Sequence, residues 1–467
     1  MNITKILYGL LLGSIFASCK VTKDFQRPSV NLPEKFRNAD TLLRGDTVLV
    51  GYREFFKNET LLSLIDTALE YNSDVLIALK NIDLARAGFR QVKLNYWPEL
   101  KGSLDATRNT ASRNSFNGAM AEGAGATLAY TDFTASLGMS WEIDIWGKIK
   151  RQKEEALSGY LQQQEVRKAV QSRVIADVAG GYYNLLLLDQ QLKIADRSRA
   201  LADSTVQIMQ VQFRVGEANA LGIHQAQAQL EQVKQLSSRI RQDITLQENA
   251  LRLLCGVYAD TVVRKLATGE ELLVQTDQYE VAILAGRPDV YASELEVRAA
   301  NARVGVSLTN LYPALTLTAT GGLNALKASD WFSVPASLFS NVAGGLVQPI
   351  FYKGRLKLQY EQAKIERDKA VISFRQTVLN AYKEVADANV KARELGLQLH
   401  YAVNREQELQ QAVGAAGILF KNGEANYLDI ITAESNYLQA GLDAAQLRND
   451  QLQNRIALFR AIGGGMK

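Results

Sequence analysis

The segment Phe213-Arg-Val-Gly-Glu-Ala-Asn-Ala-Leu-Gly-Ile223 returns in the second half of the chain as Phe420-Lys-Asn-Gly-Glu-Ala-Asn-Tyr-Leu-Asp-Ile430. The two copies lie 207 residues apart, and eight of the fourteen positions that end at Ala226 and Ala433 are identical. A match of this length indicates a duplicated structural half, because the period is far too long for a solenoid repeat.

Further anchors extend the duplication toward the N-terminus. The offset of 207 also relates Gly147 to Gly354, and upstream it changes to 215, which relates Pro98 to Pro313. The difference of eight residues therefore falls between the proline and glycine anchors. Because insertions settle in surface loops, we expect a loop tip in this interval.

The tracts without proline predict very long helices. No proline occurs between Pro98 and Pro288 or after Pro349, and these tracts are rich in Ala, Leu, Gln, Glu, Lys and Arg, which favour helix. The glycine of the repeated Gly-Glu-Ala-Asn motif should end one helix, and the asparagine that closes the motif should cap the start of the next helix. The first helix alone would be on the order of 100 Å long at 1.5 Å per residue. The predicted helices are 148–215, 221–254, 355–421 and 428–462.

Two strand hairpins are predicted between the anchors, at about 99–146 and 314–353. Apolar and polar residues alternate there with a period of two, except in the fourth strand, about 341–351, where the alternation is poor. The first tip, about 112–125, is rich in Asn, Ser, Gly and Ala and should be an exposed loop. Alternation alone also fits a soluble, half-buried sheet, but Trp141 and Trp146 at one end of the apolar band favour strands that face lipid.

The number of strands has a consequence for assembly. Four strands per chain cannot close a barrel, and open strand edges are not tolerated in lipid, where each unpaired backbone group costs several kcal/mol. Two copies would supply eight strands and three copies would supply twelve. Because an eight-stranded interior is filled by side chains, a conduit favours three copies.

The N-terminus has the pattern of an export signal. Lys5, an apolar run of about ten residues and the small pair before Cys19 describe a secretory signal over residues 1–18, too short to span a bilayer. The position of Cys19 resembles the lipobox of bacterial lipoproteins, which implies an acyl chain on this cysteine. The next residue is Lys20 and not the Asp that favours retention in the inner membrane, so the resemblance implies an outer-membrane location. The alternative is ordinary cleavage nearby, with Cys19 an incidental thiol.

The composition argues against a catalytic, metal-binding or nucleic-acid-binding site. The 467 residues carry a net charge of +4 without a long basic run, so nucleic-acid binding has little support. Two histidines and two cysteines leave little material for a metal cluster. We expect no catalytic residue, no metal and no cofactor other than the lipid on Cys19.

With these features the chain resembles the TolC-like outer membrane efflux proteins, and the lipobox resembles the lipidated NodT-type branch that serves resistance-nodulation-division (RND) pumps. The resemblance implies a mainly helical homotrimer with a twelve-stranded barrel in the outer membrane and a twelve-helix tunnel across the periplasm. It implies a passive drug-efflux duct that meets a periplasmic adaptor and an inner-membrane RND transporter. Segments of about 30–60 and 259–280, together with the C-terminal end, would form a belt around the tunnel.

The resemblance also suggests where a periplasmic gate lies. It places an apolar ring at Leu428 and an acidic ring at Asp429, while Thr432 stands where relatives carry Asp. Three carboxylates at a narrow mouth would attract cations. The alternative is that Asp429 is a solvated residue of the first helical turn and that Leu428 packs between helices.

Both helical turns are candidate docking sites for the adaptor. Tight turns need Gly and Asn whatever binds them, but the Glu-Ala pair is retained at both turns, although a bare turn would tolerate many residues. The candidate residues are Gly216, Glu217, Ala218, Asn219, Gly423, Glu424, Ala425 and Asn426.

The predicted organisation is a signal (1–18), a lipidated extended segment (19–60), a first repeat (61–256), a linker (257–285) and a second repeat (286–467). Two other functions remain open on sequence grounds: the outer channel of a type I protein secretion system, and a non-conducting coiled-coil lipoprotein. The cargo, the adaptor, the resting state and the ion selectivity are not encoded in any recognisable motif.

Overall fold

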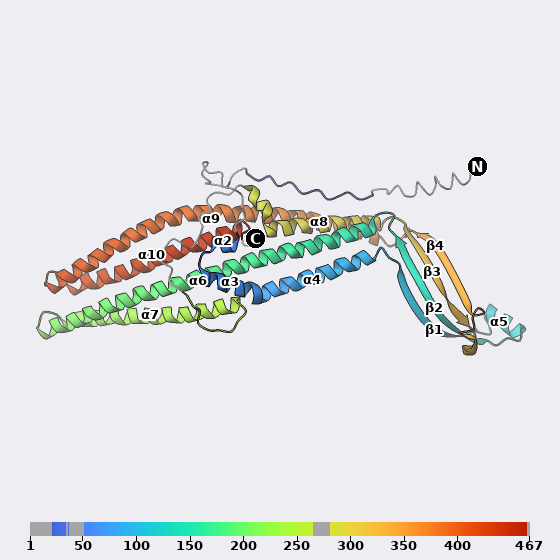
Figure 1. Ribbon diagram of the computed structural model, residues 1–467, viewed down its shortest axis with the longest axis horizontal. Coiled ribbons are helices and arrows are strands. Elements are labelled where there is room, and N and C mark those ends of the chain that lie inside the picture. The colour runs from blue at the N-terminus through green and yellow to red at the C-terminus, as the bar shows by residue number, and fades with distance from the viewer. Residues whose placement is uncertain (1–20, 34–35, 37–50, 265–280, 465–467) are drawn as a thin grey trace. The chain divides into compact units, whose positions relative to one another are not determined.

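The computed structural model describes residues 21–33, 36, 51–264 and 281–464. The chain forms two compact units. Unit 1 contains the described residues up to Pro28 together with 83–161 and 294–372, and unit 2 contains the rest. The long helices α4, α6, α8 and α9 contribute residues to both units, and all four strands belong to unit 1 (Figure 1).

The duplication is visible in the bounds of the helices. The two pairs of long hairpin helices are related residue for residue by the offset of 207, and a third pair of helices is related by 215, which confirms the duplication and the four predicted long helices. The pairs are α6 (Lys148–Arg214) with α9 (Arg355–Lys421), α7 (Ala220–Leu254) with α10 (Tyr427–Ala461), and α4 (Ser73–Leu94) with α8 (Pro288–Thr309).

The strands form one antiparallel sheet in the order β1-β2-β3-β4. The apolar residues of the alternating pattern share one face, on which Leu104 lies opposite Ala135 and Ala135 lies opposite Leu323. This face is open in the single chain, and Leu104 and Leu346 are 75% and 63% exposed. The strands are β1 (Glu99–Thr110), β2 (Ala129–Ile143), β3 (Ala314–Ala325) and β4 (Leu338–Val347).

The fourth strand lies earlier than the weak alternation predicted. It covers Leu338–Val347 instead of about 341–351. Its start is set by pairing with β3, where Leu338 lies opposite Leu323. Just beyond its end stands Pro349, which has no N–H to donate to a ladder.

The length difference between the repeats lies mainly at the hairpin tips, as predicted. The loop between β1 and β2 covers residues 111–128, whereas the loop between β3 and β4 covers only 326–337. The first tip is not only loop, because it contains the helix α5 (Phe116–Gly123). The Ser115 side chain caps this helix by accepting a hydrogen bond from the N–H of Gly118. The composition of the tip favoured a loop and concealed this short helix.

Unit 2 has an apolar core beside the middle of α6. Phe55 from α2 (Tyr52–Phe55) packs on Phe459 of α10, with ring centroids 4.4 Å apart, and Tyr182 and Tyr183 of α6 are almost fully buried. Burial raises the pKa of the Tyr183 hydroxyl. The glycines that follow Ala179 let neighbouring helices approach, since a Cβ on Gly181 would lie 2.8 Å from Leu251.

Hydrogen bonds between elements repeat along with the elements. The Asn72 side chain donates to the carbonyl of Leu254, and the Arg287 side chain, 215 residues later, donates to the carbonyl of Ala461. Each bond satisfies the last carbonyl of a helix, α7 in the first repeat and α10 in the second. The donor is in each case the residue just before the start of another helix, α4 or α8. The duplication therefore preserves packing as well as sequence.

The predicted belt is described only in part. The helix α3 (Glu59–Tyr71) and residues 257–264 belong to unit 2, whereas 34–35, 37–50 and 265–280 lie outside the described residues. Arg264 fixes the described end of the linker, because its guanidinium pairs with Asp189 of α6 at 2.6 Å and with Glu248 of α7. Among the described helices, none combines the length and the apolar character that crossing a membrane requires.

Candidate functional site

The two helical turns have the same backbone structure. Gly216 has φ +85° and Gly423 has φ +77°, and both are C′ residues in the left-handed region, which disfavours any side chain. The N–H of Glu217 donates to the carbonyl of Gln212, and the N–H of Glu424 donates to the carbonyl of Leu419. These six-to-one bonds, with the five-to-two bonds of the glycines, form a Schellman motif at each turn.

The return helices begin with different caps. The Asn219 side chain accepts one hydrogen bond from the N–H of Gly222 at 2.9 Å. The Asn426 side chain accepts from the N–H groups of Leu428 and Asp429, and the Asp429 carboxylate accepts in return from the N–H of Asn426 at 2.9 Å. Only the second turn has this reciprocal capping box, so Asp429 has a structural role at the start of α10.

The two turns are in contact with each other. A Cβ on Gly222, at the position equivalent to Asp429, would lie 2.4 Å from Cε of Met209 and 3.1 Å from Cδ1 of Tyr427. Tyr427 is the first residue of α10, so the glycine makes room for the opposite turn. An apolar cluster joins the two hairpins at this end, with Val206, Met209, Ala226, Leu230, Phe420 and Ile430 buried in it.

The side chains of the repeated Glu-Ala pair have different environments. Ala218 and Ala425 are half-buried against the apolar cluster, which accounts for their small size. Glu217 and Glu424 are exposed, and packing does not account for them.

The three predicted gate residues lie at the start of α10 and all are exposed. Leu428 is 48% exposed, and Thr432 lies one helical turn further along, so the two share a face of the helix. The alternative that Leu428 packs between helices does not hold within one chain. Asp429 is exposed in the first turn of α10, where its carboxylate accepts the capping bond from the N–H of Asn426.

A buried carboxylate beside these residues was missed by the sequence reasoning. Glu434 is 6% exposed and accepts a hydrogen bond of 2.8 Å from the Thr205 hydroxyl, while its Oε2 has no partner. Burial raises the pKa of this carboxyl group. The sequence could have revealed the burial of Glu434 through its position on the apolar face of α10, one turn after Ile430 and three residues before Tyr437.

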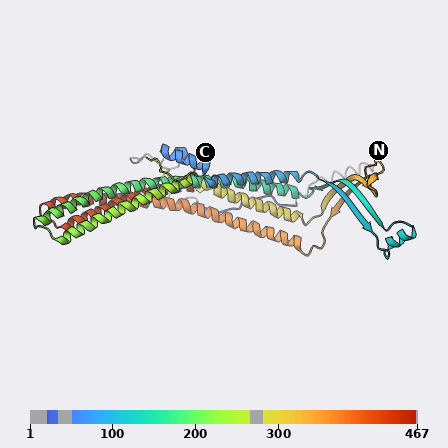
Figure 2. The same ribbon diagram turned by 90° about the horizontal axis from the view of Figure 1, so that it is seen from below.

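The lipidation candidate Cys19 lies outside the described residues, but the segment that follows it is placed in unit 1. Arg151, near the start of α6, has a 5% exposed side chain that donates to the hydroxyl of Thr22 and pairs with Asp24, both at 2.8 Å. Its other guanidinium nitrogen pairs with Glu154. A buried arginine thus fixes the chain three residues after Cys19 beside the start of α6. Figure 2 shows that the start of α6 adjoins the strands.

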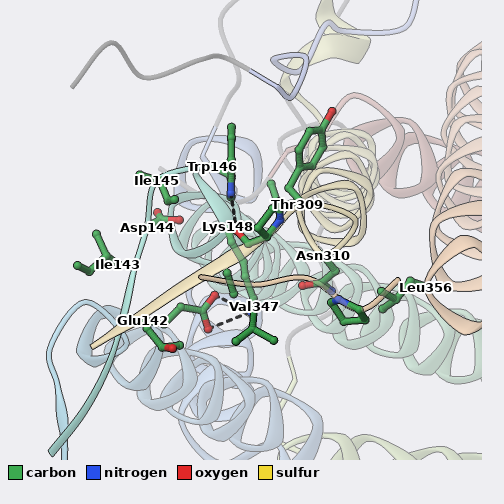
Figure 3. Close-up of a pocket in the computed structure, with 15 residues that line it drawn as sticks. Glu142, Ile143, Asp144, Ile145, Trp146, Lys148, Thr309, Asn310, Val347 and Leu356 are labelled. Atoms are coloured by element: carbon green, nitrogen blue, oxygen red, sulfur yellow. Dashed lines mark hydrogen bonds and ion pairs between the residues drawn. The ribbon is translucent and has the colours of Figure 1, made fainter. Parts of the chain in front are cut away.

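Unit 1 also contains a cavity of about 460 Å³ where the strands meet the helices (Figure 3). The indole N–H of Trp146 donates to the carbonyl of Pro313 at 2.7 Å, and its ring lies 5.1 Å from that of Tyr312. Lys148 pairs with Glu142 at 2.9 Å on the wall of the cavity. These contacts join the first repeat to the second at the base of the sheet.

The comparisons with known proteins agree with this architecture. The model of the family described as outer membrane efflux protein matches residues 64–257 and 281–464, one segment in each repeat. Among solved structures, CusC, described as forming a transmembrane channel, is 26% identical, with a TM-score of 0.85 over 96% of this chain and 100% of that chain. The CmeC outer membrane channel of Campylobacter jejuni has a TM-score of 0.86 at 22% identity over 96% of each chain and shows the shared fold.

Curated relatives cover the same length. The cation efflux system protein CusC of Escherichia coli is 27% identical over 96% of each chain. The probable outer membrane lipoprotein SilC of Salmonella typhimurium is 27% identical over 97% of this chain and 96% of that protein. The toluene efflux pump outer membrane protein TtgI of Pseudomonas putida is 26% identical over 98% and 96%.

Proposed function

The chain belongs to the outer membrane efflux protein family, and on this premise we propose that three copies form the passive outer membrane duct of a tripartite efflux pump. The duct carries small toxic compounds from the periplasm to the exterior without changing them, and it uses no catalytic residue and no cofactor. Members of this family are channel proteins.

The observation that carries the proposal is the open apolar face of the sheet. In a soluble sheet this face would be covered by other elements of the chain, but Leu100, Leu104 and Leu137 are each at least 60% exposed. An exposed apolar face of this kind is stable when it contacts lipid. The free edges of β1 and β4 must then pair with other copies, because lipid offers no hydrogen-bond partner.

The anchor of the duct is an acyl chain on Cys19. Its support is the position of Thr22, which Arg151 fixes in the same unit as the strands. From Thr22 to Cys19 is at most roughly 10 Å of extended chain. The anchor and the lipid-facing strands therefore belong at the same membrane, the outer membrane.

The gate consists of Leu428 and Asp429 from each copy. Both residues are exposed at the start of α10, and the Asp429 carboxylate also accepts the capping bond from the N–H of Asn426. In this arrangement Leu428 narrows the mouth and the three Asp429 carboxylates attract cations. Thr432, on the same face as Leu428, adds no charge.

The adaptor docks at the turns that contain Glu217 and Glu424, and through it the duct meets an inner-membrane RND transporter. The support is that both glutamates are repeated and exposed and have no packing role within the chain. Relatives of nearly equal identity are named for cation efflux and for toluene efflux. We therefore assign cargo selection to the pump and not to the duct.

Single-channel recording in planar bilayers tests the proposal. Purified protein should give discrete, long-lived conductance with a cation preference. Asp429→Asn keeps an oxygen acceptor for the cap and removes the charge, so it should weaken the cation preference while the conductance persists. Absence of conductance from a verified trimer in which Leu428→Ser has also been introduced would refute the duct.

A further inference from the structure

The apolar face of the sheet carries one charged residue among the four described strands, Arg108 of β1. Arg108 lies opposite Thr131 of β2, one pleat beyond the pair formed by Ala106 and Phe133. Since strand residues two apart share a face, Arg108 belongs to the face of Leu104. The remaining charged residues of the strands all alternate onto the polar face: Glu99, Lys101, Asp105, Asp132 and Glu142. Arg108 is therefore the exception to an otherwise complete separation of charge from the apolar face.

Arg108 lies toward the end of the sheet at which the hairpin tips 111–128 and 326–337 are found, away from α4 and α6 (Figure 1). From Leu100 to Arg108 the strand rises about 27 Å, which is about 20 Å in height at the usual tilt of a barrel strand. The apolar band of such barrels is about 25 Å tall. With Leu100 near one boundary of the band, Arg108 lies near the other boundary, where a charged residue costs little.

Aromatic side chains mark both boundaries of the apolar face. At the end of the tips, the Trp331 ring lies 5.6 Å from that of Phe133 and 5.2 Å from that of Phe332, which is 68% exposed. At the other end stands Trp141, which lies opposite Leu317 on the same face. Aromatic rings gather where hydrocarbon meets the headgroups of a membrane. Arg108, one pleat beyond Phe133, therefore lies at the level where the headgroups begin.

A second cation lies at the same end of the sheet. Lys327 follows β3 by two residues, and Ala325, the last residue of β3, lies opposite Phe133. Arg108 and Lys327 thus flank β2 on its two sides, and both are exposed. Neither forms an ion pair within the part of the chain that the structure describes.

The carboxylates closest in sequence to these cations are bound elsewhere. Asp132 lies on the polar face, where its carboxylate accepts a hydrogen bond of 2.6 Å from the Asn324 side chain. The Asp330 carboxylate accepts from the Ser329 hydroxyl at 2.9 Å. The edge strand β4 contains no charged residue, so a copy that pairs through this edge brings no strand carboxylate to Arg108. The anion that balances Arg108 must then come from the surroundings of the sheet.

We propose that Arg108, with Lys327 beside it, binds the phosphate group of a lipid headgroup in the outer leaflet of the outer membrane. This inference rests on the proposed duct, whose strands contact lipid and whose hairpin tips face outward. The planar guanidinium donates two parallel N–H bonds to phosphate oxygens, and the Lys327 ammonium adds a positive charge. Thr131, opposite Arg108 on the same face, offers a hydroxyl as a further donor.

Lipid binding to the full-length, detergent-extracted protein tests the proposal. Native mass spectrometry would follow a titration with diphosphoryl lipid A and a parallel titration with lipid A whose phosphates have been removed. The wild type should bind the phosphorylated lipid at least about tenfold more tightly, since each cation near a membrane surface contributes to the attraction. Arg108→Gln should remove most of this preference, and Arg108→Gln with Lys327→Gln should remove all of it.

The matched control is Lys101→Gln, which removes one positive charge from the same strand but from the polar face, where Lys101 pairs with Glu99 at 3.6 Å. The control should keep the preference of the wild type. Equal losses in Arg108→Gln and Lys101→Gln would show that net charge alone attracts the lipid and would overturn the site. Equal binding of the two lipids by the wild type would overturn it as well.

Two further measurements separate the possible failures. Inorganic phosphate at the concentration of the lipid should not displace it, and efficient displacement would show a site for free phosphate instead of a headgroup. Protein that leaves the membrane fraction in carbonate without detergent would refute the proposed duct itself. Protein that needs detergent and conducts ions, but does not distinguish the two lipids, would refute only the site.

Arg108→Lys keeps the test decisive if Arg108→Gln does not assemble. The lysine retains the charge at the boundary but loses the two parallel N–H bonds, so affinity for the phosphorylated lipid should fall about threefold. Affinity equal to that of the wild type would contradict recognition by the guanidinium.

Discussion

Gly222 of the first return helix packs directly against Tyr427 of the second, with room for a hydrogen but not for a methyl group between them. The sequence repeat pairs Gly222 with Asp429, so the same position provides close packing in one turn and a capping carboxylate in the other. The two turns of one chain are therefore not interchangeable, although they share the Gly-Glu-Ala-Asn motif.

Gly222→Ala should destabilise the helical end of the protein by about 1–3 kcal/mol, because the new Cβ overpacks the contact with Met209 and Tyr427. Thermal unfolding followed by circular dichroism measures the loss. Gly414→Ala in α9 meets no atom within 4 Å and should leave the stability unchanged or raise it by up to about 1 kcal/mol. Equal effects of the two substitutions would contradict the close contact.

Glu434 should make stability depend on pH. Because burial raises the pKa of its carboxyl group in the folded state, the folded protein binds the proton more tightly than the unfolded chain. Stability is therefore higher at acidic pH and falls as pH rises from the ordinary glutamate range through the raised pKa. Glu434→Gln should reduce the change of unfolding free energy with pH, measured by denaturant unfolding between pH 4 and pH 8. Glu424→Gln, at an exposed position, should leave this pH dependence unchanged.

Asp429 has two roles that can be separated. Asp429→Ala removes both the charge and the capping acceptor and should cost about 1 kcal/mol of stability, while Asp429→Asn should cost less. If the carboxylates form a ring at the mouth, both variants should lose cation preference to the same degree in reversal-potential measurements. A loss confined to the Ala variant would mean that the cap, and not the charge, affects conduction.

Glu424→Trp should weaken binding of the periplasmic adaptor by at least about tenfold and leave the trimer intact, because the residue is exposed and its side chain has no packing role. Binding can be measured by surface plasmon resonance with immobilised adaptor. Gln411→Trp, at an exposed position on α9, is the control for a bulky substitution. Unchanged affinity in the Glu424 variant would remove this turn from the docking site.

Arg287 should be the most sensitive charged residue of unit 2. Its side chain is 6% exposed, pairs with Asp289 and Glu384 at 2.7 and 2.8 Å, and donates to the carbonyl of Ala461. Arg287→Ala removes the donor to Asp289 and to the Ala461 carbonyl, while Glu384 keeps Arg460 at 3.7 Å. Because both carboxylates are more than a third exposed, the loss should be about 1–3 kcal/mol in chemical denaturation. The exposed Arg393, for which the described residues provide its neighbour Glu394 as ion-pair partner, should tolerate the same substitution.

The sequence determined the duplication, the long helices and most strand positions, because these depend on local signals. Proline-free tracts of helix formers continue until a glycine with positive φ ends them, as at Gly216 and Gly423, and alternation with a period of two marks a strand wherever one face is apolar. The candidate turns were identified for the same reason, since a turn motif is contiguous in the chain.

Only the tertiary structure decided which side chains are buried and which edges stay open. Glu434 is buried because Thr205, more than two hundred residues earlier, packs against it, and β4 begins where its partner strand allows. The burial of Arg287 depends on its contacts with α9 and α10. These properties come from contacts between distant segments, and no local pattern encodes the free energy of such contacts.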